Sequence, residues 1–189
     1  HVGSLLRPRE LRDAFRRHAQ GELTAPAFAE VQDMAIRAVV RLQEDAGLKV
    51  VTDGEFRRSS YWGRFVERCS GFAIKPALFR FRDDHGHEAD FTATYAAARL
   101  ARTQPLAADE FAYLSRVAKA MPKITMPAPS TMHFYRCGDF ADSKAYADAE
   151  TFFADLARER GQNVVEGQAL DLRILVPAFM ISELKRAFE

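Results

Sequence analysis

The sequence contains little cysteine and no long apolar run. Only two of its 189 residues are cysteine, Cys69 and Cys137, and they form no repeated spacing. This excludes a small disulfide scaffold and a self-contained cysteine zinc knuckle. No run approaches the roughly 18 apolar residues of a membrane-spanning helix. Residues 1–4 also lack the features of a signal peptide. We therefore expect a cytoplasmic protein with no membrane partner.

The chain also lacks an excess of either charge. It has 27 Lys and Arg against 26 Asp and Glu, a formal net charge of +1. It offers neither the broad basic surface that nucleic acids require nor an acidic field for cations. Phosphate-loop, dinucleotide-binding and Ser/His/Asp nucleophile patterns are absent from the sequence as well. With 48% hydrophobic residues, the chain can bury a substantial core, and we expect residues 1–189 to form one α/β domain.

Helix and strand signals alternate along the first 60 residues. Pro8 opens a short amphipathic helix, and Thr24 is a good N-cap for a longer helix whose apolar stripe runs to Gly47. The run Leu48–Val51 then predicts a short buried strand that ends in the charged turn of residues 53–58. Helix, glycine, strand and charged turn form an αβ unit, and such units with parallel strands build barrels or doubly wound sheets.

Residues 72–120 interrupt this order. Aromatic residues alternate with charged ones in the first part, which predicts a hairpin whose polar tip contains His85 and His87. These two histidines could bind a metal, but no second ligand pair lies nearby, so a solvated turn is favoured. Two helices are predicted to follow, at residues 95–102 and 107–120.

A second strand is predicted at Lys123–Met126, and the prolines after it end that strand. The residues that follow are expected to form a loop at the carboxyl end of the sheet, with Ser130 and Phe134 available to a ligand. A helix is predicted at residues 150–160. His133 and Cys137 lie four residues apart, a spacing that could begin a zinc site on a helix, although their turn-like surroundings favour a structural role.

Two predicted strand ends each place a glycine beside a polar residue, in Gly3-Ser4 and Gly54-Glu55. Glycine allows the backbone to come close to a ligand, serine and its amide can bind a carboxylate, and Glu55 can pair with an ammonium group. The ends of parallel strands meet at one edge of a sheet, where ligands bind. Together these residues predict a site for an amino acid.

Three separated segments resemble cobalamin-independent methionine synthase, in its catalytic C-terminal domain and its short stand-alone relatives. They are Val2–Ser4, the stretch Gln43–Arg58 with its T-D-G-E-F-R-R turn, and Lys123–Ser130. The resemblance covers about residues 1–158 and includes only the N-terminal half of that domain. It implies a TIM-type (β/α) barrel that stops here after about four strands, with the hairpin and helices of residues 72–120 as an excursion.

The resemblance also implies a function. Members of the family move a methyl group from a folate-type donor to the thiol of homocysteine, which is held on zinc. The segment that grips the amino-acid part of homocysteine corresponds to Val2, Gly3 and Ser4, and the glutamate that holds its ammonium group corresponds to Glu55. Phe134 corresponds to a family tryptophan near the folate, and Ser130 and Phe134 are possible contacts on the donor side. The implied partners are an amino-acid thiol and a methyl donor.

This sequence also lacks several features of the family. Its zinc ligands are a His-x-Cys pair, a glutamate and a later cysteine, and this sequence contains no His-x-Cys, so no metal ligand can be assigned. Residues 159–189 do not resemble the family. We expect the isolated chain to be inactive, and to form a homo-oligomer because a half barrel leaves sheet edges open. Two alternatives stay open: a binding or assembly protein without metal, and a different thiol alkyltransferase or decarboxylase related to uroporphyrinogen decarboxylase.

Overall fold

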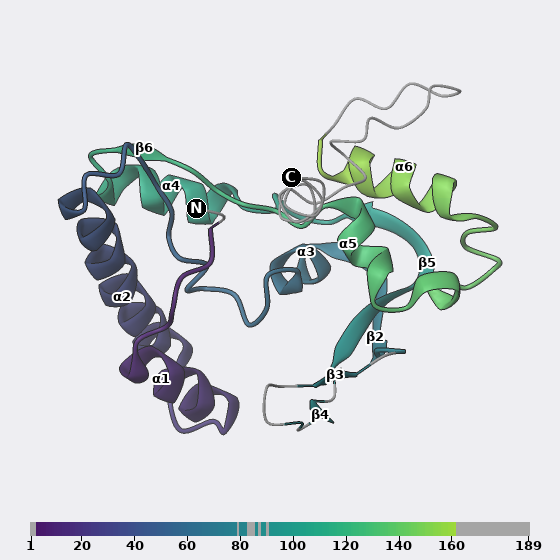
Figure 1. Cartoon of the computed structure of the whole chain (residues 1–189), viewed down its shortest axis with the longest axis horizontal. Coiled ribbons are helices and arrows are strands. Elements are labelled where there is room, and N and C mark those ends of the chain that lie inside the picture. The colour runs from purple at the N-terminus through teal and green to yellow at the C-terminus, as the bar shows by residue number, and fades with distance from the viewer. Residues whose placement is uncertain (1–2, 79, 83–85, 87, 90, 162–189) are drawn as a thin grey trace. The chain divides into compact units, whose positions relative to one another are not determined.

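The computed structural model describes residues 3–161, apart from residues 79, 83–85, 87 and 90. The chain divides into two compact units. The first consists of His1–Arg64 and Ala107–Met126, and the second of Phe65–Leu106 and Pro127–Glu189. The α/β character predicted from the sequence is confirmed, because both units combine helices with strands (Figure 1).

The first unit packs three helices around a short parallel pair of strands. Its elements are α1 (Arg9–Ala19), α2 (Ala25–Asp45), β1 (Val50–Val51), α4 (Ala108–Val117) and β6 (Met121–Pro122). The Thr24 hydroxyl accepts a hydrogen bond from the Ala27 N–H, so the predicted N-cap of α2 is confirmed. The buried core contains Leu11, Ile36, Val40, Val51, Phe56 and Leu114. This core fixes the position of the turn that follows β1.

The second predicted strand lies two residues earlier than expected. Val50 pairs with Met121 and Val51 with Pro122, in parallel. The Lys123 N–H still donates a hydrogen bond to the Val51 carbonyl at 2.9 Å, but residues 123–126 are not part of a strand. β1 itself is only two residues long, so its partner stops with it. The parallel pairing that the αβ pattern predicted is confirmed.

The second unit is built on a long antiparallel ladder. Its elements begin at the boundary between the units with α3 (Gly63–Glu67), followed by β2 (Cys69–Pro76), β3 (Phe81–Arg82), β4 (Glu88–Ala89), β5 (Thr92–Arg102), α5 (Pro129–Phe134), a 3-10 turn (Cys137–Asp139) and α6 (Ala149–Glu159). β2 pairs with β5, and β3 pairs with β4. The predicted hairpin is therefore confirmed by the pairing of β3 with β4, while His85 and His87, predicted for its tip, lie outside the described residues.

The predicted helix at residues 95–102 is wrong, because these residues belong to strand β5. Its alanine-rich sequence favours a helix locally, but pairing with β2 on both sides of an irregularity between Ser70 and Phe72 overrides that preference. The predicted helix at 107–120 is confirmed as α4, although it ends at Val117.

The expected loop around Ser130 is also wrong. Pro129 begins the short helix α5, as proline suits the first turn of a helix.

The second unit has an aromatic core around α6. Asp148 caps this helix by accepting the Thr151 N–H at 2.7 Å, and Gly161, with φ +81°, follows its end. Phe152 and Leu156 of α6 are fully buried. The Tyr146 hydroxyl accepts the Leu100 N–H of β5 and donates to Asp155 of α6, each at 2.9 Å. These bonds tie α6 to the ladder.

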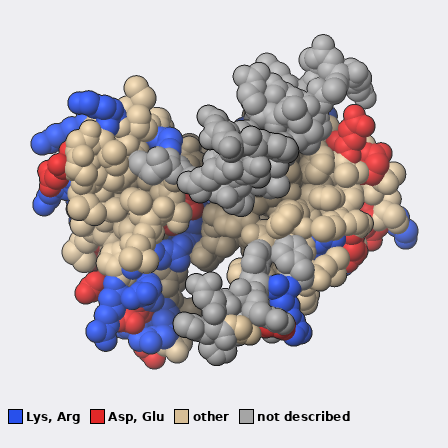
Figure 2. All heavy atoms as spheres, viewed as in Figure 1, with Lys and Arg blue, Asp and Glu red and all other residues tan. Residues whose placement is uncertain are grey.

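Charged side chains of both signs occur on the face shown in Figure 2. Blue atoms gather over α1, whose last turn contains Arg16 and Arg17. No helix within residues 3–161, as far as they are described, is long and apolar enough to cross a membrane.

Candidate functional site

The candidate site is organised by the turn that follows β1. Gly54 and Glu55 both have positive φ angles, 69° and 59°, and the Phe56 N–H returns to the Asp53 carbonyl at 3.4 Å. The Glu55 N–H donates to Asp53 Oδ1 at 2.9 Å. Glycine adopts this left-handed conformation without cost, whereas Glu55 does not. The turn therefore holds Glu55 in a backbone conformation that must be stabilised by its surroundings.

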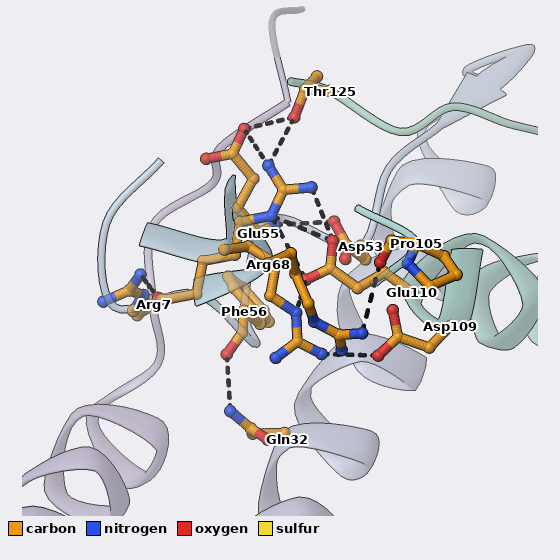
Figure 3. Close-up of polar contacts among 12 residues, drawn as sticks. Arg7, Gln32, Asp53, Glu55, Phe56, Arg68, Pro105, Asp109, Glu110 and Thr125 are labelled. Atoms are coloured by element: carbon orange, nitrogen blue, oxygen red, sulfur yellow. Dashed lines mark hydrogen bonds and ion pairs between the residues drawn. The ribbon is translucent and has the colours of Figure 1, made fainter. Parts of the chain in front are cut away.

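The carboxylate of Glu55 is buried beside the N-terminal segment. The Thr125 hydroxyl donates to Glu55 Oε1 at 2.5 Å, and in Figure 3 the two side chains face each other. A Cβ atom at Gly3 would lie 3.1 Å from Glu55 Oε1 and 2.4 Å from the Thr125 methyl group. Only glycine therefore allows the backbone to come this close. The structure brings together Gly3 and Glu55, the two positions for which the sequence predicts a shared amino-acid site.

Backbone contacts fix the N-terminal segment against the turn. The Thr52 hydroxyl donates to the Gly3 carbonyl at 2.8 Å, and the Leu5 N–H donates to the Gly54 carbonyl at 3.2 Å. Ser4 lies between these two contacts and is exposed. Val2 lies outside the described residues. Gly3 and Ser4 thus follow the edge of the turn, where a backbone amide or hydroxyl can meet a small ligand.

A buried ion pair lies behind the turn. Arg58 donates to Glu110 Oε2 from Nη2 at 2.7 Å and from Nε at 3.1 Å, and the two side chains are 3% and 0% exposed. Arg58 Nη1 lies 3.9 Å from Glu55 Oε1. Burial alone lowers the pKa of Arg58, but the hydrogen bonds and charge of Glu110 raise it overall. Arg58 therefore stays charged and links α4 to the turn.

Asp53 adds a second buried carboxylate to the turn. It is 3% exposed, and its Oδ2 atom has no hydrogen-bond partner among the described residues. Burial, together with the charges of Glu110 and Glu55, raises the pKa of Asp53. Glu55, Asp53 and Glu110 thus surround one fully buried guanidinium, that of Arg58.

Ser130 and Phe134, the predicted donor-side residues, belong to the second unit. Both lie on α5, where the Ser130 hydroxyl is buried without a partner among the described residues and Phe134 is 47% exposed.

Sequence reasoning missed Thr125, Asp53 and Glu110 as site residues. Thr125 lies within the second predicted strand and Asp53 just after the first, a signal that could have identified them. Glu110 lies on α4, with no local signal.

The described residues do not fit a zinc site. They contain no group of three or more His, Cys, Asp or Glu side chains that could hold a metal ion. His133 packs against the rings of Phe140 and Phe153, and burial lowers its pKa. The exposed Cys137 thiol donates to the Phe134 carbonyl, while burial raises the pKa of Cys69 to about 11, so its thiol is protonated at neutral pH. This part of the chain supplies no thiolate pair for zinc.

No protein-family model matches this sequence. Individual proteins do match it. The uncharacterized protein YxjH of Bacillus subtilis is 35% identical over 163 residues, covering 84% of this chain and 41% of YxjH. Methionine synthase of Sulfurisphaera tokodaii is 27% identical over 178 residues, covering 94% of this chain and 51% of that enzyme. The chain is homologous to methionine synthase.

Solved structures agree with this relationship at the level of the fold. The structure of a putative vitamin-B12-independent methionine synthase from Listeria monocytogenes superposes with a TM-score of 0.60 and 23% identity, covering 85% of this chain and 47% of that one. A B12-independent methionine synthase from Shewanella, solved in complex with selenomethionine, gives the same TM-score and coverage at 19% identity. The resemblance to cobalamin-independent methionine synthase predicted from the sequence is confirmed. The chain spans about half the length of these relatives.

A short stretch is similar to a different protein. Over 37 residues, 20% of the chain, it is 62% identical to the flagellar biosynthetic protein FliP of Rhizobium meliloti. FliP of Agrobacterium fabrum is 60% identical over the same length. The chain covers only 15% of each FliP protein, so this similarity does not extend the functional comparison with methionine synthase.

Proposed function

We propose that the first unit is the amino-acid-binding part of a methyltransferase that makes methionine from homocysteine and a folate-type methyl donor. In this proposal Glu55 binds the ammonium group of homocysteine, and Gly3 and Ser4 bind its carboxylate. One observation carries the assignment: the buried Glu55 carboxylate lies beside Gly3, where a Cβ atom would lie 3.1 Å from Glu55 Oε1 and would clash with Thr125 at 2.4 Å. The Shewanella relative bound to selenomethionine supports a ligand of this class.

The electrostatics of the turn support a cationic ligand. The Glu55 carboxylate accepts one close hydrogen bond, from Thr125, while its nearest buried guanidinium, Arg58, makes its shorter bonds to Glu110. Arg58 makes only a long ion pair with Glu55, at 3.9 Å, and an ammonium group of the ligand can add a charge-assisted hydrogen bond, which is stronger than a neutral one. The pairing of Arg58 with Glu110 therefore leaves Glu55 available to the ligand.

The fold supports the same proposal. The parallel β1–β6 pair, with α2 and α4 packed on it, is consistent with part of a (β/α) barrel. In such barrels the ligand site lies at the carboxyl ends of the strands, and the Glu55 turn directly follows β1. We propose that this pair belongs to the first half of such a barrel.

We expect the replacement of Glu55 with glutamine to weaken homocysteine binding strongly. The glutamine side chain has nearly the same shape but no charge, so we expect the affinity for L-homocysteine to fall by at least about tenfold. Isothermal titration calorimetry of the wild-type and Glu55→Gln proteins measures this change. The thiol should be kept reduced throughout the titration.

A matched ligand provides the control for this experiment. 4-Mercaptobutyrate has the thiol and carboxylate of homocysteine but no ammonium group, so the substitution should change its affinity by less than about twofold. Equal homocysteine affinities for the two proteins would refute the assignment of Glu55. They would favour a binding or assembly role, or an anionic substrate of a related barrel enzyme.

Zinc would supply the acidity that converts the homocysteine thiol into a nucleophile. Since the described residues do not fit zinc, we propose that the isolated chain does not catalyse methyl transfer. Metal analysis of the purified chain tests this directly, and we expect less than about 0.1 zinc per chain. Stoichiometric zinc, or methionine formation from homocysteine and a methylfolate, would contradict the proposal.

A further inference from the structure

Glu55 has an unusual backbone conformation. Among the described residues, only Glu55 and Cys137 combine a side chain with a positive φ angle, 59° and 44° respectively. For residues other than glycine this conformation is disfavoured, and it persists only where the surroundings enforce it. At Glu55 the conformation determines the direction of the side chain that approaches Gly3 and Thr125. The group that enforces it therefore controls the site.

The Asp53 side chain is in position to enforce this conformation. Its Oδ1 atom accepts the Glu55 N–H at 2.9 Å, two residues along the chain. An Asp side chain that binds the backbone two residues ahead replaces a backbone turn contact and stabilises tight turns. The Phe56 N–H bonds to the Asp53 carbonyl, so main chain and side chain of Asp53 both hold the turn.

The cost of burying Asp53 indicates that this contact matters. Its Oδ2 atom is buried without a hydrogen-bond partner among the described residues, and the residue is 3% exposed. A buried carboxylate oxygen without a partner destabilises a fold. The charges of Glu110 and Glu55 add to this cost and, after burial itself, raise the pKa of Asp53. Packing alone does not account for an aspartate at this position.

We propose that Asp53 is a positioning residue, whose Oδ1 atom holds the Glu55 N–H so that the Glu55 carboxylate faces Gly3 and the ligand. This inference rests on the proposed role of Glu55 in ammonium binding. It assigns to Asp53 no contact with the ligand. Its side chain acts through the backbone of the turn, and the acceptor oxygen, rather than the negative charge, is the feature that is needed.

Two substitutions separate the acceptor from the charge. Asparagine keeps an Oδ1 acceptor without the charge, so Asp53→Asn should keep the homocysteine affinity within about threefold of wild type. Alanine removes the acceptor, so Asp53→Ala should lower the affinity by about tenfold. Isothermal titration calorimetry measures both, and circular dichroism verifies that each variant is folded. If the alanine variant does not fold, Asp53→Ser provides a weaker acceptor and should give an intermediate loss.

A double-substitution cycle distinguishes positioning from a general structural role. Because Asp53 acts through Glu55, Asp53→Ala should add less than about twofold to the loss caused by Glu55→Gln. Additive losses, or an asparagine variant as weak as the alanine variant, would overturn the inference. If Glu55→Gln itself binds homocysteine normally, the proposed function fails. If Glu55→Gln loses binding while Asp53→Ala keeps it, only the positioning role fails.

Discussion

Replacing Glu110 with alanine is expected to lower the free energy of unfolding by about 3–5 kcal/mol. Glu110 is fully buried and accepts hydrogen bonds from both Nε and Nη2 of Arg58, which is itself 3% exposed. The substitution leaves a guanidinium buried without its main partner, which costs far more than the pair contributes as a whole. Urea unfolding followed by circular dichroism measures the change.

The neighbouring Asp109 provides a matched control on the same helix. Its side chain is 49% exposed, and its Oδ2 atom lies 2.7 Å from Arg64 Nη2. Asp109→Ala should therefore lower the free energy of unfolding by less than about 1 kcal/mol. Replacing both members of the buried pair, as Arg58→Met with Glu110→Leu, should recover only part of the lost stability, because the two paired charges leave together but the buried Asp53 and Glu55 lose the guanidinium near them. A Glu110→Ala protein as stable as the Asp109→Ala protein would contradict the buried pairing.

In the second unit, Phe152→Ala is expected to lower the free energy of unfolding by about 3–5 kcal/mol. Phe152 is 1% exposed, and its ring lies between those of Phe140 and Tyr146, with centroid distances of 5.0 and 5.3 Å. The truncation removes these ring contacts and leaves a cavity against α6 that the aromatic core cannot fully close.

Urea unfolding also measures this second effect. Phe153→Ala is the control, because Phe153 is the next residue of α6 and only half-buried, so its truncation should cost clearly less. A smaller loss for Phe152→Ala than for Phe153→Ala would show that α6 presents its other face to the core. Together, the Glu110 and Phe152 variants test the packing of each unit separately.

Much of the helical structure could be predicted from local signals. Thr24 and Gly47 mark the ends of α2 in the sequence, and Gly161 marks the end of α6, because caps and glycine stops act over only a few residues. Residues 95–102 could not be predicted in this way. Their alanine-rich sequence has no strand signal, and only β2, more than 20 residues away in the chain, makes them a strand.

Some expectations are still predictions. The homo-oligomer and the identity of the methyl donor are untested. The expected divergence of residues 159–189 from methionine synthase also stays a prediction, and the match to methionine synthase of Sulfurisphaera tokodaii covers 94% of the chain. Ser130 and Phe134 are still candidates for donor contacts, now on a helix rather than a loop.

The sequence alone singled out the two main candidate residues, Gly3 and Glu55, although only Glu55 follows a strand and the described residues 3–8 form none. Only the tertiary structure showed that they meet, and that Thr125 and Asp53 flank Glu55. The reason is physical. Turn and capping preferences depend on neighbours in the chain, whereas the desolvation and pairing of Glu55, Arg58 and Glu110 depend on which distant segments pack together.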